Sequence, residues 1–483
     1  MAAADLYRPP APRPMTPVRS LLRVVRQGDG DLLSLVPRAA YEQPLTWLGY
    51  SRRSILLVND PALCRAVLAD ADGVFPKNDL MVGALEGLVG DSIFVSSGAT
   101  WRRQRRMIDP AFSHIRITRA FGPMVEAVDA YERVLDARAE AGEPFSLDLA
   151  MSHLTADVIC RTIFSTALDS SVAREVFDDF LLFERSVASV NLRQLIVGKP
   201  WAKIRQPPKV VAACARIRAR IGELLDPRLE AARAGRAVAG GGAEHEADDI
   251  VGAIIDATDP ETGKRFTREE LIDQIGVFFL AGHETTASVL TWVFFVLSQR
   301  PDIAARIRRD VAGVVGEGPV EFAHVRRLPF LRNVFREALR LYPPITFLPR
   351  VAEAPTTIGG VRVKRGAMIM ISPWTAHRNA GLWRDADRFD PDRFDDGGDH
   401  AEGGGEGTGE RAGRGVNMSF GIGPRVCIGA SFATTEAVLI LARLVRRYDI
   451  ETLDPGAVRP VARLTTRPAT EIDVRVSRAR GTG

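Results

Sequence analysis

Apolar residues recur at three- and four-residue spacing over most of the chain, a spacing typical of amphipathic helices. The pattern covers residues 112–233 with little interruption. Another helix is expected over residues 267–300, because Thr267 and Glu270 have the spacing of an N-terminal capping box. Residues 277–280 of that helix are apolar on every side, so we expect it to cross the interior.

Shorter segments complete the expected secondary structure. Helices are predicted at Ala62 to Ala69, Phe330 to Tyr342 and Ala430 to Arg443. Strand-like sequence is confined to Leu45 to Val58, Thr357 to Val363 and Met368 to Ser372. Helix predominates, and the expected fold class is mainly α with a minor β region (α+β).

Two glycine-rich stretches, residues 235–248 and 395–415, contain too few apolar residues to pack and are expected to be flexible insertions. Neither separates halves that would fold alone. We therefore interpret residues 1–44 as a proline-rich N-terminal tail with a first helix, and residues 45–483 as a single domain.

Composition narrows the function classes. The 483 residues are 46% hydrophobic, enough for a large core, and the formal charge of +4 gives no support to nucleic-acid binding. Four scattered cysteines are typical of a reducing compartment, and we find neither a signal peptide nor a membrane anchor. We expect a cytoplasmic monomer.

One cysteine stands in a glycine-rich turn directly ahead of a predicted helix, in the run Phe420-Gly421-Ile422-Gly423-Pro424-Arg425-Val426-Cys427-Ile428-Gly429. Backbone amides and the positive end of a helix dipole both favour a thiolate there. Glycines let the backbone pass close to a flat ligand. Such a loop suits a thiolate ligand to iron, and the alternative is a buried, inert cysteine beside an ordinary turn.

This run resembles the haem-binding signature of the cytochrome P450 family, Phe-x-x-Gly-x-Arg-x-Cys-x-Gly, at every fixed position. The resemblance extends over residues 45–450 and implies the P450 fold, a long central helix over haem b and a soluble bacterial-type member. Cys427 would be the axial metal ligand. The other cofactor contacts implied in the loop are Phe420, Gly421, Arg425 and Gly429.

The long predicted helix contains Ala281-Gly282-His283-Glu284-Thr285-Thr286, which resembles the oxygen-activation motif of that family. By this resemblance Ala281 and Gly282 would leave space for dioxygen. Thr285 would hold an oxygen-derived ligand or a water by a hydrogen bond, and Glu284 would relay protons. Two protons must reach a dry site, which calls for an acid and an alcohol side by side. The alternative is two merely solvated polar residues.

Two histidines are given no catalytic role. His283-Glu284 begins like a zinc-binding HExxH motif, but residue 287 is Ala287, so a zinc site is rejected. His283 is expected to point away from the ligand. His377 lies in a segment similar to one in which the family carries histidine for structural reasons.

Arginines are expected to bind the two haem propionates, because their planar forks match carboxylates. Trp101 and Arg105 are one helical turn apart and resemble the family's Trp-x-x-x-Arg, and Arg350 and Arg425 are further candidates. Three neighbouring arginines are interpreted as a solvated face that could attract an acidic redox protein: Arg102, Arg103 and Arg106.

Glu337 and Arg340 are three residues apart on a predicted helix, where they can pair. The resemblance implies that they form a buried ion network with Arg393 and fix the region carrying the cysteine. Their role would be structural.

The resemblance therefore implies a haem-thiolate monooxygenase that hydroxylates a lipophilic substrate with O2. Fatty acids, terpenoids or carotenoids are favoured as substrates. No reductase domain fits this length, so a ferredoxin and its reductase would supply electrons. The expected pocket residues are Phe278, Phe279, Ala281, Phe347, Leu348 and an apolar loop at residues 81–89. Alternatives are a peroxygenase, a rearranging haem-thiolate enzyme or a non-catalytic haem-binding sensor.

Overall fold

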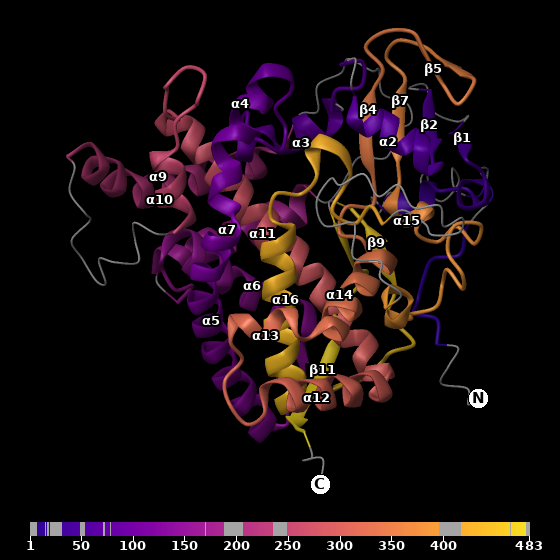
Figure 1. The fold of residues 1–483 in the computed structure, drawn as a ribbon. Coiled ribbons are helices and arrows are strands. Elements are labelled where there is room, and N and C mark those ends of the chain that lie inside the picture. The colour runs from indigo at the N-terminus through magenta and orange to yellow at the C-terminus, as the bar shows by residue number, and fades with distance from the viewer. Residues whose placement is uncertain are drawn as a thin grey trace.

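Helices fill most of the molecule, and a small sheet lies at one side (Figure 1). The computed structural model describes residues 7–14, 16, 19, 31–48, 54–70, 73–77, 79–169, 171–187, 206–234, 249–395, 417–463 and 465–479. The predicted fold class, mainly α with a minor β region, is confirmed.

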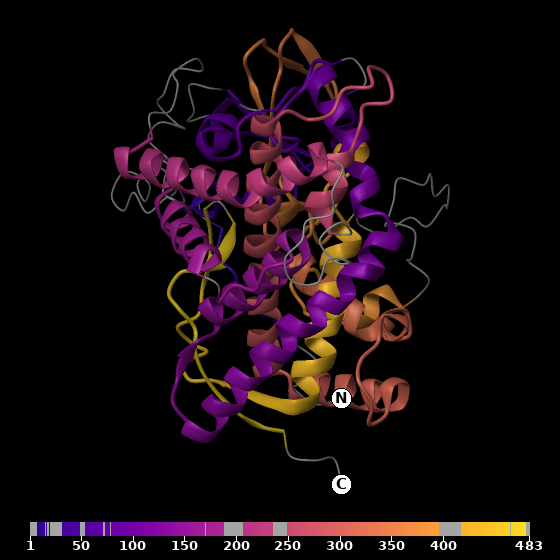
Figure 2. The same ribbon diagram turned by 90° about the vertical axis from the view of Figure 1, so that its left-hand side faces the viewer.

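The long helix α11 (Arg268–Gln299) runs through the middle of the structure (Figure 2). Its predicted capping box is present: Glu270 N–H donates to Thr267 Oγ1 at 3.2 Å, and Thr267 N–H donates to Glu270 Oε2 at 2.8 Å. Within the described residues α11 alone is long and apolar enough to cross a membrane, but 83% of its most apolar window is buried inside the protein. It is therefore a core helix.

Other helices surround α11. It packs most extensively on α6 (Leu147–Phe164), and α9 (Pro208–Arg233) crosses its N-terminal half (Figure 2). The remaining α-helices are α2 (Pro61–Ala69), α3 (Asp79–Val89), α4 (Gly98–Ile108), α5 (His114–Ala141), α7 (Ser171–Val187), α10 (Ile250–Asp256), α12 (Pro301–Val315), α13 (Phe322–Arg326), α14 (Pro329–Leu341), α15 (Pro373–Ala376) and α16 (Ala430–Arg447).

The largest sheet has the strand order β1-β2-β7-β4. Its members are β1 (Leu45–Leu48), β2 (Ile55–Val58), β4 (Leu348–Val351) and β7 (Met368–Ile371). Pairing is parallel only between β2 and β7, and Arg350 of β4 lies opposite Ile369. Strand β4 thereby places Arg350 beside the cavity described below. Smaller sheets are formed by β3 (Phe145–Ser146), β11 (Asp473–Arg478) and β8 (Tyr448–Thr452), by β5 (Thr356–Ile358) and β6 (Val361–Val363), and by β9 (Pro460–Ala462) and β10 (Thr466–Pro468).

Several predicted elements are found where the sequence placed them, among them α2, α11, α14, α16 and the strands β1, β2 and β7. Residues 81–89, expected as a loop, are helical in α3. The expected insertion at residues 235–248 lies outside the described residues, and so does the one at 395–415 except for Asp395.

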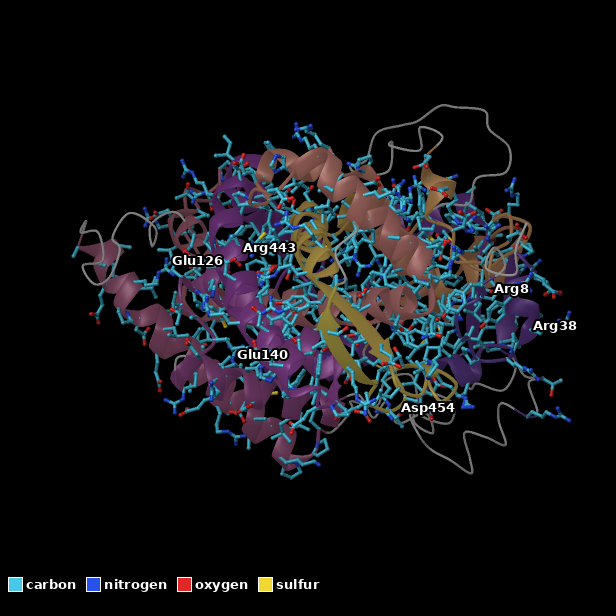
Figure 3. All side chains as sticks on the ribbon, turned by 90° about the horizontal axis from the view of Figure 1, so that it is seen from below. Arg8, Arg38, Glu126, Glu140, Arg443 and Asp454 are labelled. Atoms are coloured by element: carbon cyan, nitrogen blue, oxygen red, sulfur yellow. The ribbon has the colours of Figure 1, made fainter. Side chains whose placement is uncertain are left out.

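The N-terminal segment contacts the body of the protein. Tyr342 Oη donates to the Pro10 carbonyl at 2.7 Å, and Phe389 N–H donates to the Tyr7 carbonyl at 3.4 Å. Seen from below, Arg8 lies on the opposite side of the molecule from Glu126 of α5 (Figure 3). In the described part of residues 1–44, two 3₁₀ helices follow, Leu32–Leu35 and Arg38–Tyr41.

Candidate active site

A cavity of about 310 Å³ separates the middle of α11 from the cysteine loop. Apolar side chains make up most of its wall, including Phe94, Phe112, Ile159 and Phe278. The predicted site residues all line it: Trp101, Arg105, Ala281, Gly282, Glu284, Thr285, Arg350, Phe420, Gly421, Arg425, Cys427 and Gly429. Segments far apart in the sequence thus meet at one place.

The cysteine loop presents a thiol to this cavity. Gly421 and Gly423 both have φ +77°, a conformation that other residues rarely adopt, and the Cys427 amide donates to the Phe420 carbonyl at 2.8 Å. The Cys427 side chain is open to the cavity although it lies deep in the molecule. Burial raises the pKa of the Cys427 thiol, and the Gly429 amide and the positive charge of Arg105 act in the opposite direction. A cationic ligand at the sulfur would reverse the effect of burial.

A buried ion network supports the loop. Glu337 receives a bidentate pair of bonds from Arg340 at 2.7 and 2.8 Å, and a third bond from Arg393 Nε at 2.9 Å. The side chains of Glu337 and Arg340 are fully buried. Arg340 also donates to the carbonyls of His377 and Ala386. Both charges are therefore matched.

His377 joins this network to the cysteine loop. Its Nδ1 lies 3.0 Å from the Arg340 carbonyl, and its Nε2 accepts from the Met418 amide at 2.9 Å. Because Nε2 must be an unprotonated acceptor, the neutral Nδ1–H tautomer fits. Burial, and secondarily the charge of Arg340, lower the pKa of His377 to about 3. The histidine is a structural link, in agreement with its expected lack of a catalytic role.

One edge of the cavity collects cations that donate to backbone carbonyls and form no ion pair with a carboxylate among the described residues: Lys77 to Phe94, Arg350 to Pro349 and Arg425 to Ser96. Burial lowers the pKa of Arg350 and of Arg425 to about 10, and the charge of Arg350 adds to the effect on Arg425. Lys77 lies beside them, half-buried, and its pKa is well below its usual range because of desolvation and the charges of these two arginines. Among the described residues none of the three forms an ion pair with a carboxylate, and Arg425 Nη1 has no hydrogen-bond partner.

Neighbouring side chains hold these cations in place. The Arg425 guanidinium lies over the Trp101 ring, 4.4 Å from its centroid, and Nη2 donates to the Ser96 carbonyl at 2.9 Å. Arg105 Nη1 donates to the Val426 carbonyl at 2.7 Å, inside the cysteine loop. A flat ligand with carboxylates at this edge and a metal over Cys427 would satisfy the orphaned groups, so the residues present fit such a group.

On the opposite wall, Thr285 Oγ1 donates to the Ala281 carbonyl one turn earlier, at 2.6 Å. Packing also requires a glycine at position 282, in addition to the open space that Gly282 was expected to leave. A Cβ at Gly282 would lie 2.3 Å from Cδ1 of Ile159, which itself lines the cavity. The absence of that Cβ lets α6 approach α11 closely.

Glu284 is held by Arg467 of β10 and by Thr465, which directly precedes that strand. Its Oε1 accepts from Arg467 Nε of β10 at 2.7 Å and also from the Thr465 hydroxyl. Arg467 Nη2 pairs with the second oxygen of Glu284 and lies 3.1 Å from Glu184 Oε2 of α7. The carboxyl of Glu284 is thus fixed at the cavity wall by residues that the sequence did not indicate.

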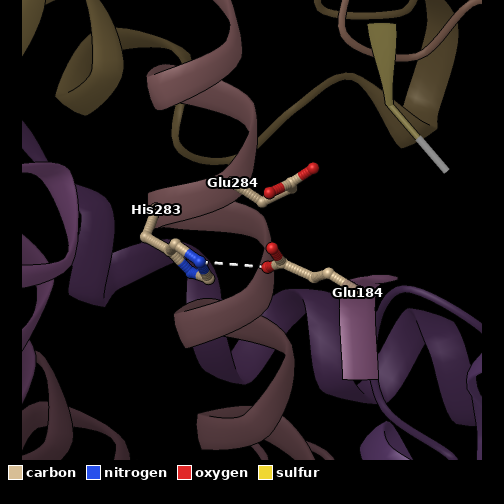
Figure 4. A group of neighbouring side chains, drawn as sticks. All are labelled: Glu184, His283 and Glu284. Carbon is tan, nitrogen blue, oxygen red and sulfur yellow. Dashed lines mark ion pairs between the residues drawn. The ribbon is translucent and has the colours of Figure 1, made fainter. Parts of the chain in front are cut away.

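His283 points away from the cavity, as expected, and contacts Glu184. Figure 4 shows the carboxyl of Glu184 turned toward the imidazole, with Nε2 3.0 Å from Oε1. Possible ligand atoms of Glu184, His283 and Glu284 lie within 4.8 Å of one another. The guanidinium of Arg467 already supplies a positive charge to both carboxyls, so we assign no metal to this cluster.

Some pocket residues differ from expectation. Phe278, Ala281, Leu348 and, from the 81–89 segment, Leu85 line the cavity. Phe279 instead packs on Phe180 and His283, and Phe347 belongs to the separate core beneath the sheet. A one-residue step along a helix turns a side chain by about 100°, so Phe278 and Phe279 cannot both face one cavity.

The arginines expected to form an open basic face are partly paired. Arg103 lies 2.6 Å from Glu270, and Arg106 lies 2.8 Å from Glu261 and 3.3 Å from Asp259. These carboxylates neutralise them, which weakens their expected attraction for an acidic redox protein. Arg102 is exposed.

The sequence also missed Glu436 of α16. Burial raises the pKa of its carboxyl well above the usual range, and neither carboxyl oxygen has a hydrogen-bond partner. Thr286, which lines the cavity, acts on this carboxyl in the opposite direction. The signal available in the sequence was a single acidic residue, Glu436, in an otherwise apolar stretch.

Comparison with known proteins gives consistent results. The family model described as Cytochrome P450 matches residues 9–474. Cyclooctat-9-en-7-ol 5-monooxygenase of Streptomyces melanosporofaciens is 32% identical over 85% of this chain and 82% of its own length. The LUTEIN DEFICIENT 5 protein of Arabidopsis thaliana is 29% identical over 88% of this chain and 71% of its own length. A crystal structure of the cytochrome P450 CYP102L1 superposes with a TM-score of 0.73 at 23% identity, covering 98% of this chain and all of that one.

Proposed function

Because the chain belongs to the cytochrome P450 family and is an oxidoreductase, we propose that it is a haem-thiolate monooxygenase that hydroxylates a lipophilic substrate. The observation that carries the proposal is the shared cavity: a thiol on one wall, an acid and an alcohol on the other, and cations without a carboxylate partner at one edge. Relatives named as hydroxylases and monooxygenases support the reaction class. They come from plants as well as Streptomyces, so membership of a bacterial-type subclass stays a prediction.

In this proposal Cys427 binds the iron of haem b through its thiolate. Lys77, Arg350 and Arg425, with Trp101 and Arg105 beside them, would bind the propionates. The two carboxylates would neutralise cations that are otherwise buried without counter-charges. Bound haem supplies the chemistry of dioxygen activation, which amino-acid side chains do not provide.

The protein's own part is proton supply and exclusion of water. Thr285 has its hydroxyl at the cavity and a rotamer fixed by the Ala281 carbonyl, so it can hold a water or a ligand in place. Glu284 has one face toward the cavity and the other bound to Arg467, and it can pass a proton inward. The presence of both groups supports a monooxygenase over a peroxygenase, a rearranging enzyme or a sensor.

The apolar wall supports a substrate that is recognised by shape and hydrophobic contact. Relatives carry names that include cyclooctat-9-en-7-ol, pentalenene and lutein. We therefore propose terpenoids or carotenoids ahead of fatty acids.

Electrons would come from a separate ferredoxin and its reductase. The paired state of Arg103 and Arg106 means that docking would need other surface charges. A single domain over residues 45–483, a cytoplasmic location and a monomeric state remain predictions, and the match of one family model to residues 9–474 supports the first.

The test is spectroscopic. Carbon monoxide added to the reduced, haem-loaded protein should give a Soret band shifted well to the red, the sign of thiolate ligation. Cys427→Ser should abolish the shift. A colourless protein, or an unchanged spectrum in the variant, would overturn the proposal.

Thr285→Ala tests the assigned role of the alcohol. The carbon monoxide spectrum should stay unchanged, because the thiolate side is untouched, while electrons are diverted from product to hydrogen peroxide. The ratio of product to NADH consumed measures this, and an unaltered ratio would refute the role.

A further inference from the structure

The end of the cavity away from the cations is apolar. The side chains that line it there include Phe112, Ile163, Ile250 and Phe278. The rings of Phe112 and Phe278 meet edge to face, with their centroids 5.4 Å apart. Phe112 comes after Trp101 on helical turns that continue from α4, which places it roughly 16 Å further along that axis. The cavity therefore has cations at one end and hydrocarbon at the other.

One carboxylate lies directly behind two of these apolar residues. Asp249 precedes Ile250 and caps α10, because its Oδ1 accepts from the Gly252 amide at 2.8 Å. Its Oδ2 accepts from the Ser165 hydroxyl at 2.8 Å. Ser165 ends α6 with φ +53° and stands just after Ile163 in the chain. The start of α10 and the end of α6 are thus joined at a single carboxyl.

Arg228 of α9 binds the same carboxyl with both prongs of its guanidinium. Nη2 donates to Oδ1 of Asp249 at 2.7 Å, and Nη1 donates to Oδ2 at 2.9 Å. The two side chains are only 12% and 5% exposed, so solvent screens this pair little. A bidentate pair fixes direction as well as distance. Asp249 therefore holds three helices, α6, α9 and α10, in one arrangement.

We infer that Asp249 is a positioning residue for haem, because it fixes Ile163 and Ile250 as a wall for the apolar edge of the porphyrin. This inference rests on the proposed function. Asp249 does not itself line the cavity, so it acts through the two isoleucines. Haem b carries propionates at one edge and methyl and vinyl groups at the opposite edge, which matches a cavity with one cationic and one apolar end.

A wall of fixed shape also selects one face of the cofactor. Turning haem over leaves the propionates at the same edge but exchanges methyl and vinyl groups at the other edge. Closely packed side chains distinguish groups of different size, because a misfit forces strain or leaves a void. The clamped wall should therefore admit haem in one orientation, and a loosened wall should admit both.

Asp249→Asn tests the clamp. The amide keeps an acceptor for the Gly252 and Ser165 donors but removes the charge that Arg228 binds. Haem should leave the ferric protein about tenfold faster, as expected when a hydrogen bond to a charged group is weakened. Transfer of haem to apomyoglobin measures this rate. Proton NMR of the haem-loaded variant should show a second set of haem-methyl signals, where the wild type shows one.

Asp226→Asn is the matched control. Asp226 also ties α9 to another helix, through Arg268 at 2.6 Å, but these side chains are 46% and 42% exposed and neither lines the cavity. This variant should keep the rate of haem loss and the single set of signals.

Two further variants test the route from the carboxyl to the cavity. Ile250→Ala should produce the second set of signals by itself, and adding Asp249→Asn should then change less than it does in the wild type, because the two residues act in series. Arg228→Lys keeps the charge but loses the fork, so it should give intermediate values. It also serves as the test if Asp249→Asn does not fold.

Neither measurement depends on product formation. If the wild type shows the thiolate spectrum and Asp249→Asn keeps both its rate of haem loss and a single orientation, the inference is wrong and the proposed function stands. Faster haem loss without a second orientation would mark a purely structural role and would also overturn the inference, as would two orientations in the wild type. A wild-type protein that takes up no haem would overturn the proposed function, and the inference with it.

Discussion

Two groups of charged side chains lie near the cysteine loop, and they differ in whether each charge has an opposite charge beside it. Glu337 binds Arg340 and Arg393, and the guanidinium of Arg340 also reaches backbone carbonyls. Lys77 and Arg425, at the cavity edge, find no carboxylate among the described residues, and their pKa values are lowered as a result of burial.

This difference in charge matching indicates that the Glu337 network serves the fold and that the cavity-edge cations serve ligand binding. A network with every charge partnered is complete in the protein alone and needs no ligand. Cations gathered without a carboxylate partner are costly in the protein alone and become favourable when an anion binds. The first group is therefore expected to control folding in all states, and the second to control affinity for the cofactor.

Breaking the matched group should have the largest effect. Glu337→Gln leaves Arg340 buried without a counter-charge, and the free energy of unfolding should fall by about 3–5 kcal/mol with or without haem. Chemical denaturation of both forms measures this. Glu317→Gln, at an exposed acid, is the control and should change little. Equal stability of the Glu337 variant and the wild type would contradict the assignment.

The pH dependence of His377 should give an intermediate effect. Its pKa is about 3 in the folded protein and about 6.5 when unfolded, so the unfolded chain binds more protons in between. The contribution of His377 to the free energy of unfolding is therefore fully present above pH 6.5 and is lost as the pH falls below that value. We expect a loss of about 2 kcal/mol between pH 6.5 and 5. Denaturation at a series of pH values measures it, and His377→Gln should flatten that slope.

Removing a cation from the unmatched group should have the smallest effect on stability, and one of opposite sign. Lys77→Met takes away a half-buried charge that two arginines repel, so the haem-free protein should gain about 1 kcal/mol in stability, while haem should dissociate faster. Lys364→Met, at an exposed lysine, is the control.

A pH series sharpens this last prediction. Because the pKa of Lys77 is lowered on folding, the unfolded chain holds the proton longer, and the haem-free wild type should become more stable as the pH rises toward 10.5. The variant should lose that slope. If Lys77→Met instead destabilised the haem-free protein, the charge of Lys77 beside Arg350 and Arg425 would not be unfavourable in that state.

The sequence predicted the parts of the site that lie within short segments. The cysteine loop and the Ala281 to Thr286 run each combine unusual residues over a few positions, and most of these residues line the cavity. Arg467 and Glu184 could not be found in this way, because they meet Glu284 only through packing of β10 and α7 on α11. No motif near Lys77 marks it as a site residue either, because it meets Arg350 only through an isolated antiparallel β-bridge between backbone segments that are far apart in the sequence.

Side-chain direction was the other limit. Phe279 and Phe347 are apolar residues beside true cavity residues, and composition alone does not tell which neighbour faces inward. Gly282 shows the same limit, because only the structure reveals that Ile159 fills the space of its missing side chain.

The bond from the Tyr342 hydroxyl to the Pro10 carbonyl has a practical consequence for protein production. Tyr342 follows α14, the helix that carries Glu337 and Arg340, and burial raises its pKa well above the usual range. Deleting the first fifteen residues would strip this phenol of its acceptor next to the ion network. Trimming the amino end should therefore lower the yield of folded protein.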